Sequence, residues 1–220
     1  MFWVGWFAVA SLLYWKIKSK LRAGAQLFCL SEIEFIQGKG HKTLTDAILI
    51  DKFENLGKDL KKLRIVHKIS GVFNELVKGQ EKDDNLWNLL NESFNKLNNL
   101  QFTINNLQLS YYFFFWKLFS LLGYSPELYN CALCQKKLTP QKLFFSSKDG
   151  GIICEQCRNL VKSAEEIDID TIKILRILLK NDWQTVDKLK IERAHFKKLK
   201  EISENYYIHL LGDLTRIKNP

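Results

Sequence analysis

The sequence predicts an α+β fold, in which a small β-domain is followed by an α-helical bundle with an inserted four-cysteine zinc module. Three observations support this prediction. Residues 32–50 alternate as half-buried strands do, apolar residues after position 51 recur with a period near 3.6, and two Cys-x-x-Cys pairs stand between helical segments. We place the β-domain at residues 1–50 and the helical domain at residues 51–220, with the zinc module at about 128–160.

The cysteine pairs are the most specific motif in the chain. Nineteen residues separate them, enough for a β-hairpin with strands near 144–145 and 151–153 and a turn at 149–151. Two thiolate pairs complete the tetrahedral shell of structural zinc and leave no position for water. A disulfide pair or a redox motif is the alternative, and the doubled motif fits neither well. The predicted Zn²⁺ ligands are Cys131, Cys134, Cys154 and Cys157.

Composition limits the class of function. The formal net charge of +9 favours a polyanionic partner, either nucleic acid or an acidic protein segment, although excess lysine can also serve solubility alone. The fifth cysteine, Cys29, leaves an odd count, which indicates a reducing compartment, so we expect a cytoplasmic, nucleoid-associated protein. No HExxH or GxSxG motif is present, and Gly40 after Lys39 breaks a phosphate loop. We therefore predict no enzymatic activity.

The first residues form an uncharged stretch, Phe2–Trp15, that is shorter than the roughly twenty residues of a membrane span. It fits a short membrane anchor, a buried helix or strand pair, or an unnatural start from a misassigned reading frame. A basic run follows, and its cations would share one face of an extended chain. That face suits a phosphate backbone, or else a solvated edge strand. The candidate DNA-binding cations of this run are Lys16, Lys18, Lys20 and Arg22.

A hairpin is expected next, with strands at 32–36 and 43–50 joined by a turn at 38–40. Lys39 and Lys42 at its tip are further candidate DNA contacts, with a plain turn as the alternative. A helix over 56–77 is predicted from apolar positions that include Leu60 and Phe73, with His67 on the same face.

Further helices follow the same period. One starts near Asp84, capped by that residue or by Asp83, and the next, 104–122, carries seven aromatic residues between 111 and 119. A helix that is apolar all round belongs at the centre of a bundle, and Gly123 should end it.

After the zinc module, Asp168 or Asp170 can cap a helix, and a final helix should close at Gly212. A cationic cluster on this final helix could receive an acidic peptide or a phosphate strand, with a solvated face as the alternative. Its members are Arg193, Lys197, Lys198 and Lys200.

Several segments in this order resemble the bacterial recombination mediator family RecO. They are the stretch 19–28, the strand–turn–strand 32–47, the cysteine segment with Gly150-Gly151-Ile152-Ile153 before Cys154, and the late run 207–212. The resemblance covers roughly residues 16–220.

The resemblance implies an N-terminal OB-fold, which binds single strands through a basic groove and stacking aromatics. Members of the family bind single- and double-stranded DNA, anneal complementary strands, contact the acidic tail of single-stranded DNA-binding protein, and with RecR help to load RecA. The family usually opens with further barrel strands where this chain has Phe2–Trp15, so we expect a partial, OB-fold-like domain. The alternative function is a membrane-anchored zinc-bearing adaptor or a protein-docking module without DNA activity.

Overall fold

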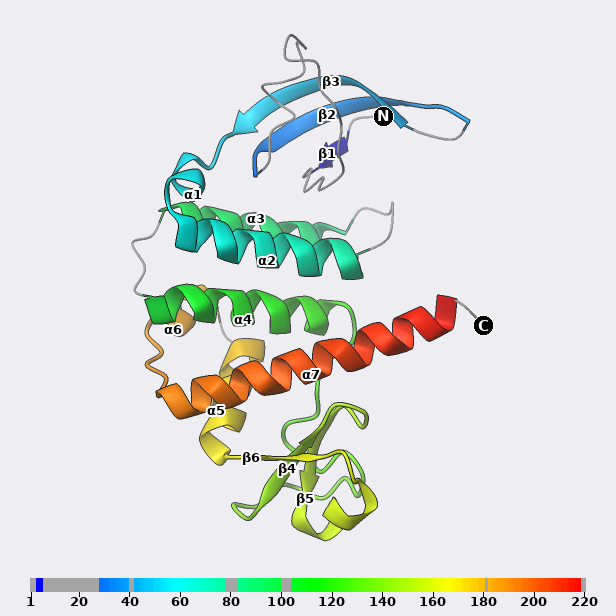
Figure 1. Cartoon of the computed structure of the whole chain (residues 1–220), viewed down its shortest axis with the longest axis vertical. Coiled ribbons are helices and arrows are strands. Elements are labelled where there is room, and N and C mark those ends of the chain that lie inside the picture. The colour runs from blue at the N-terminus through cyan, green and yellow to red at the C-terminus, as the bar shows by residue number, and fades with distance from the viewer. Residues whose placement is uncertain are drawn as a thin grey trace. The chain divides into compact units, whose positions relative to one another are not determined.

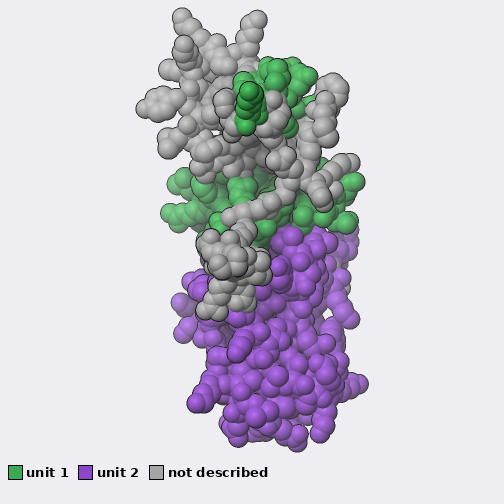
Figure 2. Space-filling view, turned by 90° about the vertical axis from the view of Figure 1, so that its right-hand side faces the viewer, with its two compact units in different colours: residues 1–102 green, residues 103–220 purple. Residues whose placement is uncertain are grey.

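The computed structural model describes residues 3–5, 28–39, 42–77, 83–99, 104–180 and 182–218 (Figure 1). The chain forms two compact units, residues 1–102 and 103–220, which Figure 2 colours separately. The boundary expected at residue 50 would separate the strands from the helices that follow them. In the structure those helices share a unit with the strands, and the ring of Phe28 lies 6.1 Å from that of Phe94.

The sheet of the first unit contains β1 (Trp3–Gly5), β2 (Leu30–Gln37) and β3 (Lys42–Asp51) in that order. Both pairings are antiparallel, and Ile33 of β2 stands opposite Ala47 of β3. The hairpin expected over 32–50 is therefore confirmed. The described part of this sheet has three strands, whereas an OB barrel has about five, so the OB-fold stays a prediction. Part of the hydrophobic N-terminal stretch lies in β1.

The helix expected over 56–77 is two helices, α1 (Glu54–Lys58) and α2 (Leu60–Leu76). Asp59 separates them and caps α2, since its side chain accepts from the Lys61 backbone N–H at 2.8 Å. This new start changes the helical phase. The predicted apolar face was right in part: Leu56, Ile69 and Ser70 are buried, as expected. It was wrong at Leu60, which is 73% exposed, and at His67, which is exposed, whereas Ile65, Val66 and Val72 complete the buried face.

Helix α3 (Asp84–Asn99) begins where the sequence indicated. Asp83 is its cap, because its carboxylate accepts from the N–H groups of Asn85 at 2.9 Å and Leu86 at 3.1 Å. The expected apolar face is confirmed, and its buried residues include Leu86, Leu90, Phe94 and Leu97.

The second unit contains α4 (Ile104–Leu121), α5 (Ile169–Lys180), α6 (Trp183–Asp187) and α7 (Arg193–Lys218), with α4 in contact with α5 and α6 (Figure 1). Aromatic helix α4 forms the core, as expected, and Phe114, Trp116 and Phe119 are fully buried. The Trp116 indole N–H donates to the Ser203 hydroxyl of α7 at 3.1 Å, which satisfies the one polar atom of a buried ring.

The ends of the long helices differ in how well the sequence indicated them. Gly123 ends α4 with a φ of +86°, and the Tyr124 N–H returns to the Phe119 carbonyl at 2.8 Å. The expectation that α7 closes at Gly212 was wrong, because the helix continues to Lys218. A glycine inside a helix costs only about 1 kcal/mol, which the buried face before it offsets. That face includes Leu199, Ile202, Tyr206 and Leu210.

Among the described helices, none combines the length and the apolar character that a membrane span requires.

Candidate metal centre

The cysteine module is built on a second sheet of β4 (Leu143–Ser146), β5 (Gly151–Cys154) and β6 (Glu165–Ile167), in the order β5-β4-β6. The hairpin expected between the cysteine pairs is confirmed. Gly150 turns it with a φ of +66°, a conformation that favours glycine. Strand β6 was not foreseen, since three residues with two glutamates give no strand pattern.

A tight turn presents the first cysteine pair. The Cys131 carbonyl accepts from the Gln135 N–H at 2.9 Å, and the Cys131 N–H donates to the Lys136 carbonyl at 2.8 Å. Gln135 adopts a φ of +57° to close this turn. The Ala132 N–H donates to the Ile152 carbonyl at 2.8 Å, which ties the turn to β5.

The second pair stands at the end of β5. Cys154 is the last residue of that strand, and a 3-10 helix at Glu155–Leu160 brings Cys157 back toward it. The Cys154 N–H donates to the Sγ of Cys131 at 3.4 Å, so the two pairs contact each other directly.

The four sulfurs have the spacing of a metal shell. All four Sγ atoms lie within 4.8 Å of one another, and those of Cys134 and Cys154 are 3.8 Å apart. A tetrahedral zinc with Zn–S bonds of about 2.3 Å separates its sulfurs by about 3.8 Å. Disulfide sulfurs stand about 2.05 Å apart, and all four cysteines are free thiols, so the disulfide alternative does not apply.

Electrostatic coupling limits how many of the four thiols can be ionised at once. Burial raises the pKa of Cys131, but the backbone N–H groups of Cys134, Cys154 and Leu133 more than offset it and lower the value to about 6. The neighbouring Cys154 thiol, followed by burial, raises the pKa of Cys157 to about 12. Four sulfurs this close cannot all carry a negative charge unless a positive ion compensates them.

An apolar shell surrounds the sulfurs. Cys131 is fully buried and Cys157 is 8% exposed, and both pack against Ile153, Val161 and Ala164. The residues present fit zinc, because four soft thiolates at tetrahedral spacing leave no open coordination position. The arrangement can hold the fold together and offers no site for a metal-bound water.

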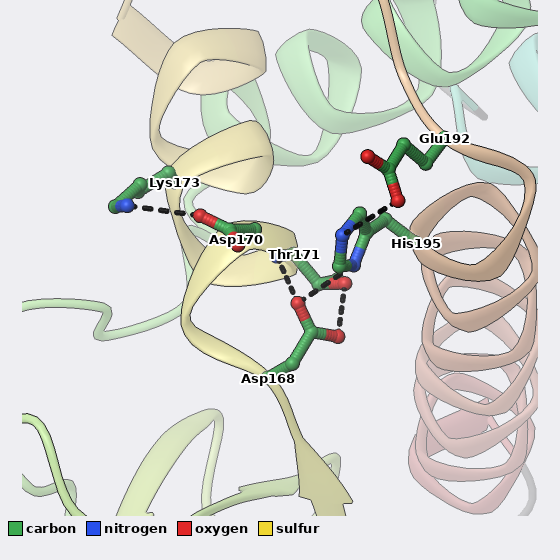
Figure 3. Close-up of polar contacts among 6 residues, drawn as sticks. All are labelled: Asp168, Asp170, Thr171, Lys173, Glu192 and His195. Atoms are coloured by element: carbon green, nitrogen blue, oxygen red, sulfur yellow. Dashed lines mark hydrogen bonds and ion pairs between the residues drawn. The ribbon is translucent and has the colours of Figure 1, made fainter.

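A second cluster of possible ligands lies between α5 and α7, where Asp168, Asp170 and His195 approach one another (Figure 3). Asp168 caps α5, since it accepts from the Thr171 N–H at 2.7 Å and hydroxyl at 2.6 Å. His195 Nδ1 stands 2.9 Å from the same carboxylate, and Asp170 pairs with Lys173 at 2.9 Å. The positive end of the α5 dipole stabilises these carboxylates without a metal. The pair between Asp168 and His195 links the start of α5 to α7.

The structure places the candidate DNA-binding cations only in part. Lys39 is exposed beyond the end of β2, and Lys42 begins β3, with its side chain outside the described part. The four cations of the basic run, Lys16, Lys18, Lys20 and Arg22, lie outside the described residues.

The cationic cluster of α7 divides in two. Lys198 is paired with Glu165 at 3.4 Å and Glu201 at 3.2 Å, so its charge is already balanced. Arg193, Lys197 and Lys200 share one exposed helix face, and Lys200 stands 3.8 Å from a Glu204 carboxylate.

Fold and site together define the class of protein: a mixed helix-and-strand chain whose helical unit carries a closed four-cysteine cluster of the structural metal type. A family model described as the C terminal of recombination protein O matches residues 57–218. The chain belongs to the RecO family.

Curated relatives extend the match beyond that region. The DNA repair protein RecO of Dehalococcoides mccartyi is 30% identical over 184 residues, which cover 84% of this chain and 71% of the relative. The RecO of Caldanaerobacter subterraneus subsp. tengcongensis is 28% identical over 79% of this chain and 68% of its own. The RecO of Halalkalibacterium halodurans is 27% identical over 89% of this chain and 74% of its own.

Proposed function

We propose that this member of the RecO family is a DNA repair and homologous recombination mediator. It binds single- and double-stranded DNA, anneals complementary strands, and with RecR assists RecA loading on strands coated with single-stranded DNA-binding protein. The observation that carries the proposal is the family match over residues 57–218, joined to relatives that are named DNA repair proteins. The net charge of +9 supports a polyanionic partner.

Annealing needs two strands of like charge to approach each other. Cations that neutralise phosphates on both strands lower this repulsion and release counterions, so the activity should weaken as salt rises. Lys39 and Lys42 of the β2–β3 hairpin, together with the basic run of residues 16–22, are the proposed contacts.

The exposed face of α7 is the proposed site for the acidic tail of single-stranded DNA-binding protein. Arg193 and Lys197 have no carboxylate within ion-pair distance in the described part of the chain, so their charge is free for a partner. Lys198 contributes less, because Glu165 and Glu201 already hold it.

The four-cysteine centre would hold zinc in a structural role. It fixes the turns that carry the two cysteine pairs and anchors them to β5, whose Ile153 packs in the same apolar cluster as Cys131 and Cys157. Loss of zinc should therefore lower stability and affect DNA activity only through the fold.

The test is annealing of complementary strands coated with single-stranded DNA-binding protein, with its acidic tail intact or deleted. We expect acceleration by the wild-type chain that depends on the tail, and a smaller effect from a variant with Arg193→Gln and Lys197→Gln. Lys198→Gln is the control, because it removes one positive charge from the same helix at a position where glutamates already balance it; the single variant Lys197→Gln makes the matched comparison.

Acceleration that is equal with and without the tail would remove the proposed role of α7 and leave DNA binding in place. A complete lack of annealing, together with a lack of DNA binding, would contradict the mediator function. It would leave the second unit as a protein-docking module.

A further inference from the structure

An exposed aromatic ring stands immediately before the first cysteine pair. Tyr129 is 42% exposed, and two cations of α5 lie over its ring. The guanidinium carbon of Arg176 is 4.4 Å from the ring centroid and the Nζ of Lys180 is 4.5 Å from it. These cations lie one helical turn apart, so a regular helix presents both to the same ring.

Backbone hydrogen bonds fix this arrangement. Arg176 donates from Nε and Nη2 to the Leu128 carbonyl, with the Nε bond at 3.1 Å. The Tyr129 N–H donates to a Glu127 carboxylate oxygen at 2.7 Å, and the Tyr129 carbonyl accepts from the Leu138 N–H at 3.0 Å. The Tyr129 backbone and the Arg176 guanidinium are therefore held in place before any ligand binds, which lowers the entropy cost of binding.

Among the described residues, Arg176 and Lys180 form no ion pair at this surface. In the described part of the chain, neither Arg176 nor Lys180 has a carboxylate within ion-pair distance. The Glu127 carboxylate accepts from the N–H groups of Asn130 and Tyr129 at 2.9 and 2.7 Å, and these bonds together with the charge of Arg176 lower its pKa, so Glu127 offsets part of the Arg176 charge. By contrast Lys173, one turn before Arg176, is paired with Asp170.

Two more cations stand on the adjacent backbone. Lys137 pairs with Asn130 in an antiparallel bridge, and the Lys136 carbonyl accepts from Cys131. Both lysine side chains are exposed. The cysteine turn thus adds positive charge next to the segment that carries Tyr129.

We propose that Tyr129, Arg176 and Lys180, which we call the Tyr129 surface, form a contact site for single-stranded DNA on the second unit. The inference rests on the proposed function and adds a site distant in sequence from the β2–β3 hairpin. The cations bind phosphates, and the exposed part of the ring packs against a base. This combination of cations and an aromatic ring is the one that binds single strands without sequence preference.

An acidic peptide is the competing ligand, since its carboxylates would meet the same cations. The exposed ring favours DNA, because every nucleotide brings a flat base to pack against it, whereas aspartate and glutamate do not.

The first experiment measures binding of a fluorescent oligo-dT by anisotropy across a salt series. The variants are Lys180→Gln, Tyr129→Leu and the control Lys173→Gln, which makes the same charge change on the same helix. We expect Lys180→Gln and Tyr129→Leu each to weaken binding about 3- to 10-fold. Lys180→Gln should also reduce the salt slope by about 0.7, the share of one single-strand phosphate contact. Lys173→Gln should bind as the wild type does, and thermal melting checks that all variants fold.

A second measurement locates the contact without a variant. Oligo-dT containing 5-iodouracil is photo-crosslinked to the wild-type chain, and the linked peptide is identified by mass spectrometry. A crosslink at Tyr129 supports the proposal, and crosslinks confined to residues 1–102 contradict it.

The outcomes separate this inference from the proposed function. If the wild-type chain binds oligo-dT and Lys180→Gln binds equally well, the Tyr129 surface is not a DNA site and the mediator function stands. An equal loss in Lys180→Gln and Lys173→Gln would also overturn the site, because the effect would then be general charge. If Lys180→Gln weakens binding of a fluorescent acidic peptide but not of DNA, the surface serves a protein partner. If the wild-type chain binds no DNA, both proposals fail.

Discussion

Gly151 lies directly against the backbone of Glu127. The Ile152 N–H donates to the Glu127 carbonyl at 2.8 Å, and the Glu127 N–H donates to the Gly150 carbonyl at 2.8 Å. A Cβ atom on Gly151 would stand 2.5 Å from that Glu127 oxygen, closer than real contacts allow. This approach lets the chain before the first cysteine pair join β5, and so sets the distance between the two pairs of ligands.

We therefore expect Gly151→Ala to destabilise the second unit by about 2 kcal/mol, because backbone atoms cannot yield as a flexible side chain would. Gly150→Ala is the matched control. Its neighbourhood is open, so only its φ of +66° is strained, and we expect a cost near 1 kcal/mol. Chemical denaturation measures both. Equal losses in the two variants would show that backbone conformation, not the close approach, determines the effect.

Gln135 allows the reverse substitution, in which glycine replaces a residue that has a side chain. It holds a φ of +57° in the turn after Cys134, where glycine has no steric penalty. Gln135→Gly should leave stability unchanged or raise it by up to about 1 kcal/mol, after the loss of a side-chain bond to the Ala132 carbonyl. Gln135→Val should lower it by about 1–2 kcal/mol. Lys136→Val, at the next exposed position, serves as the control in thermal melting.

Removal of one thiolate should cost both the metal and the stability of the unit. We expect purified wild-type chain to contain about one zinc ion and Cys154→Ser to contain much less, with a melting temperature lower by more than about 10 °C. The control is Cys29→Ala, which alters the buried fifth cysteine, outside the cluster. Elemental analysis and calorimetry read the two quantities together. Unchanged melting after zinc loss would contradict a structural role.

Asp168 should make stability depend on acid pH. Burial raises the pKa of Asp168, but its bonds to Thr171 and the nearby His195 ring outweigh this and hold the pKa below the usual 3.8. A depressed pKa stabilises the folded state above the unfolded value, and the contribution disappears as pH falls through the folded value. Asp168→Asn keeps the cap and loses the charge. Because the carboxylate is well exposed, we expect a loss of only about 0.5 kcal/mol at pH 7.

The measurement is denaturant unfolding at pH 7 and at about pH 3. The difference between Asp168→Asn and wild type should shrink toward zero at the lower pH. Asp170→Asn is the control, since the Asp170 carboxylate pairs with the exposed Lys173 of its own helix and does not accept the capping bonds from Thr171. A difference that persists at low pH would show that the capping bonds, rather than the charge, account for the effect.

Much of the fold could be predicted because local chemistry specifies it. Aspartates at 59, 83 and 168 cap helices with their own side chains, and Gly123 and Gly150 take the positive φ that their turns need. The sequence indicated the two glycines outright, and it offered Asp83 or Asp84 and Asp168 or Asp170 as alternative caps. It missed Asp59, because a cap inside a continuous apolar pattern looks like a polar position on the same helix.

Other features had no local signal. The complete buried face of α2 could not be read from spacing once the break at Asp59 had shifted its phase. Strand β6 exists because β4 offers it an edge, and α6 is a five-residue helix packed on α4 and α5. In each case the partner element, rather than the segment itself, provides the stabilising contacts.

By itself the sequence determined the family, the cluster of four cysteines and the aromatic core, because two-residue spacing and all-round apolarity restrict the possible structures so strongly. Only the tertiary structure decided which cations are free. Carboxylates balance the charges of Lys198 and Lys173, whereas the charges of Arg176 and Lys180 lie over the ring of Tyr129. The reason is physical: a thiolate turn forms within four residues, while charge balance depends on which distant segments the packed core brings together.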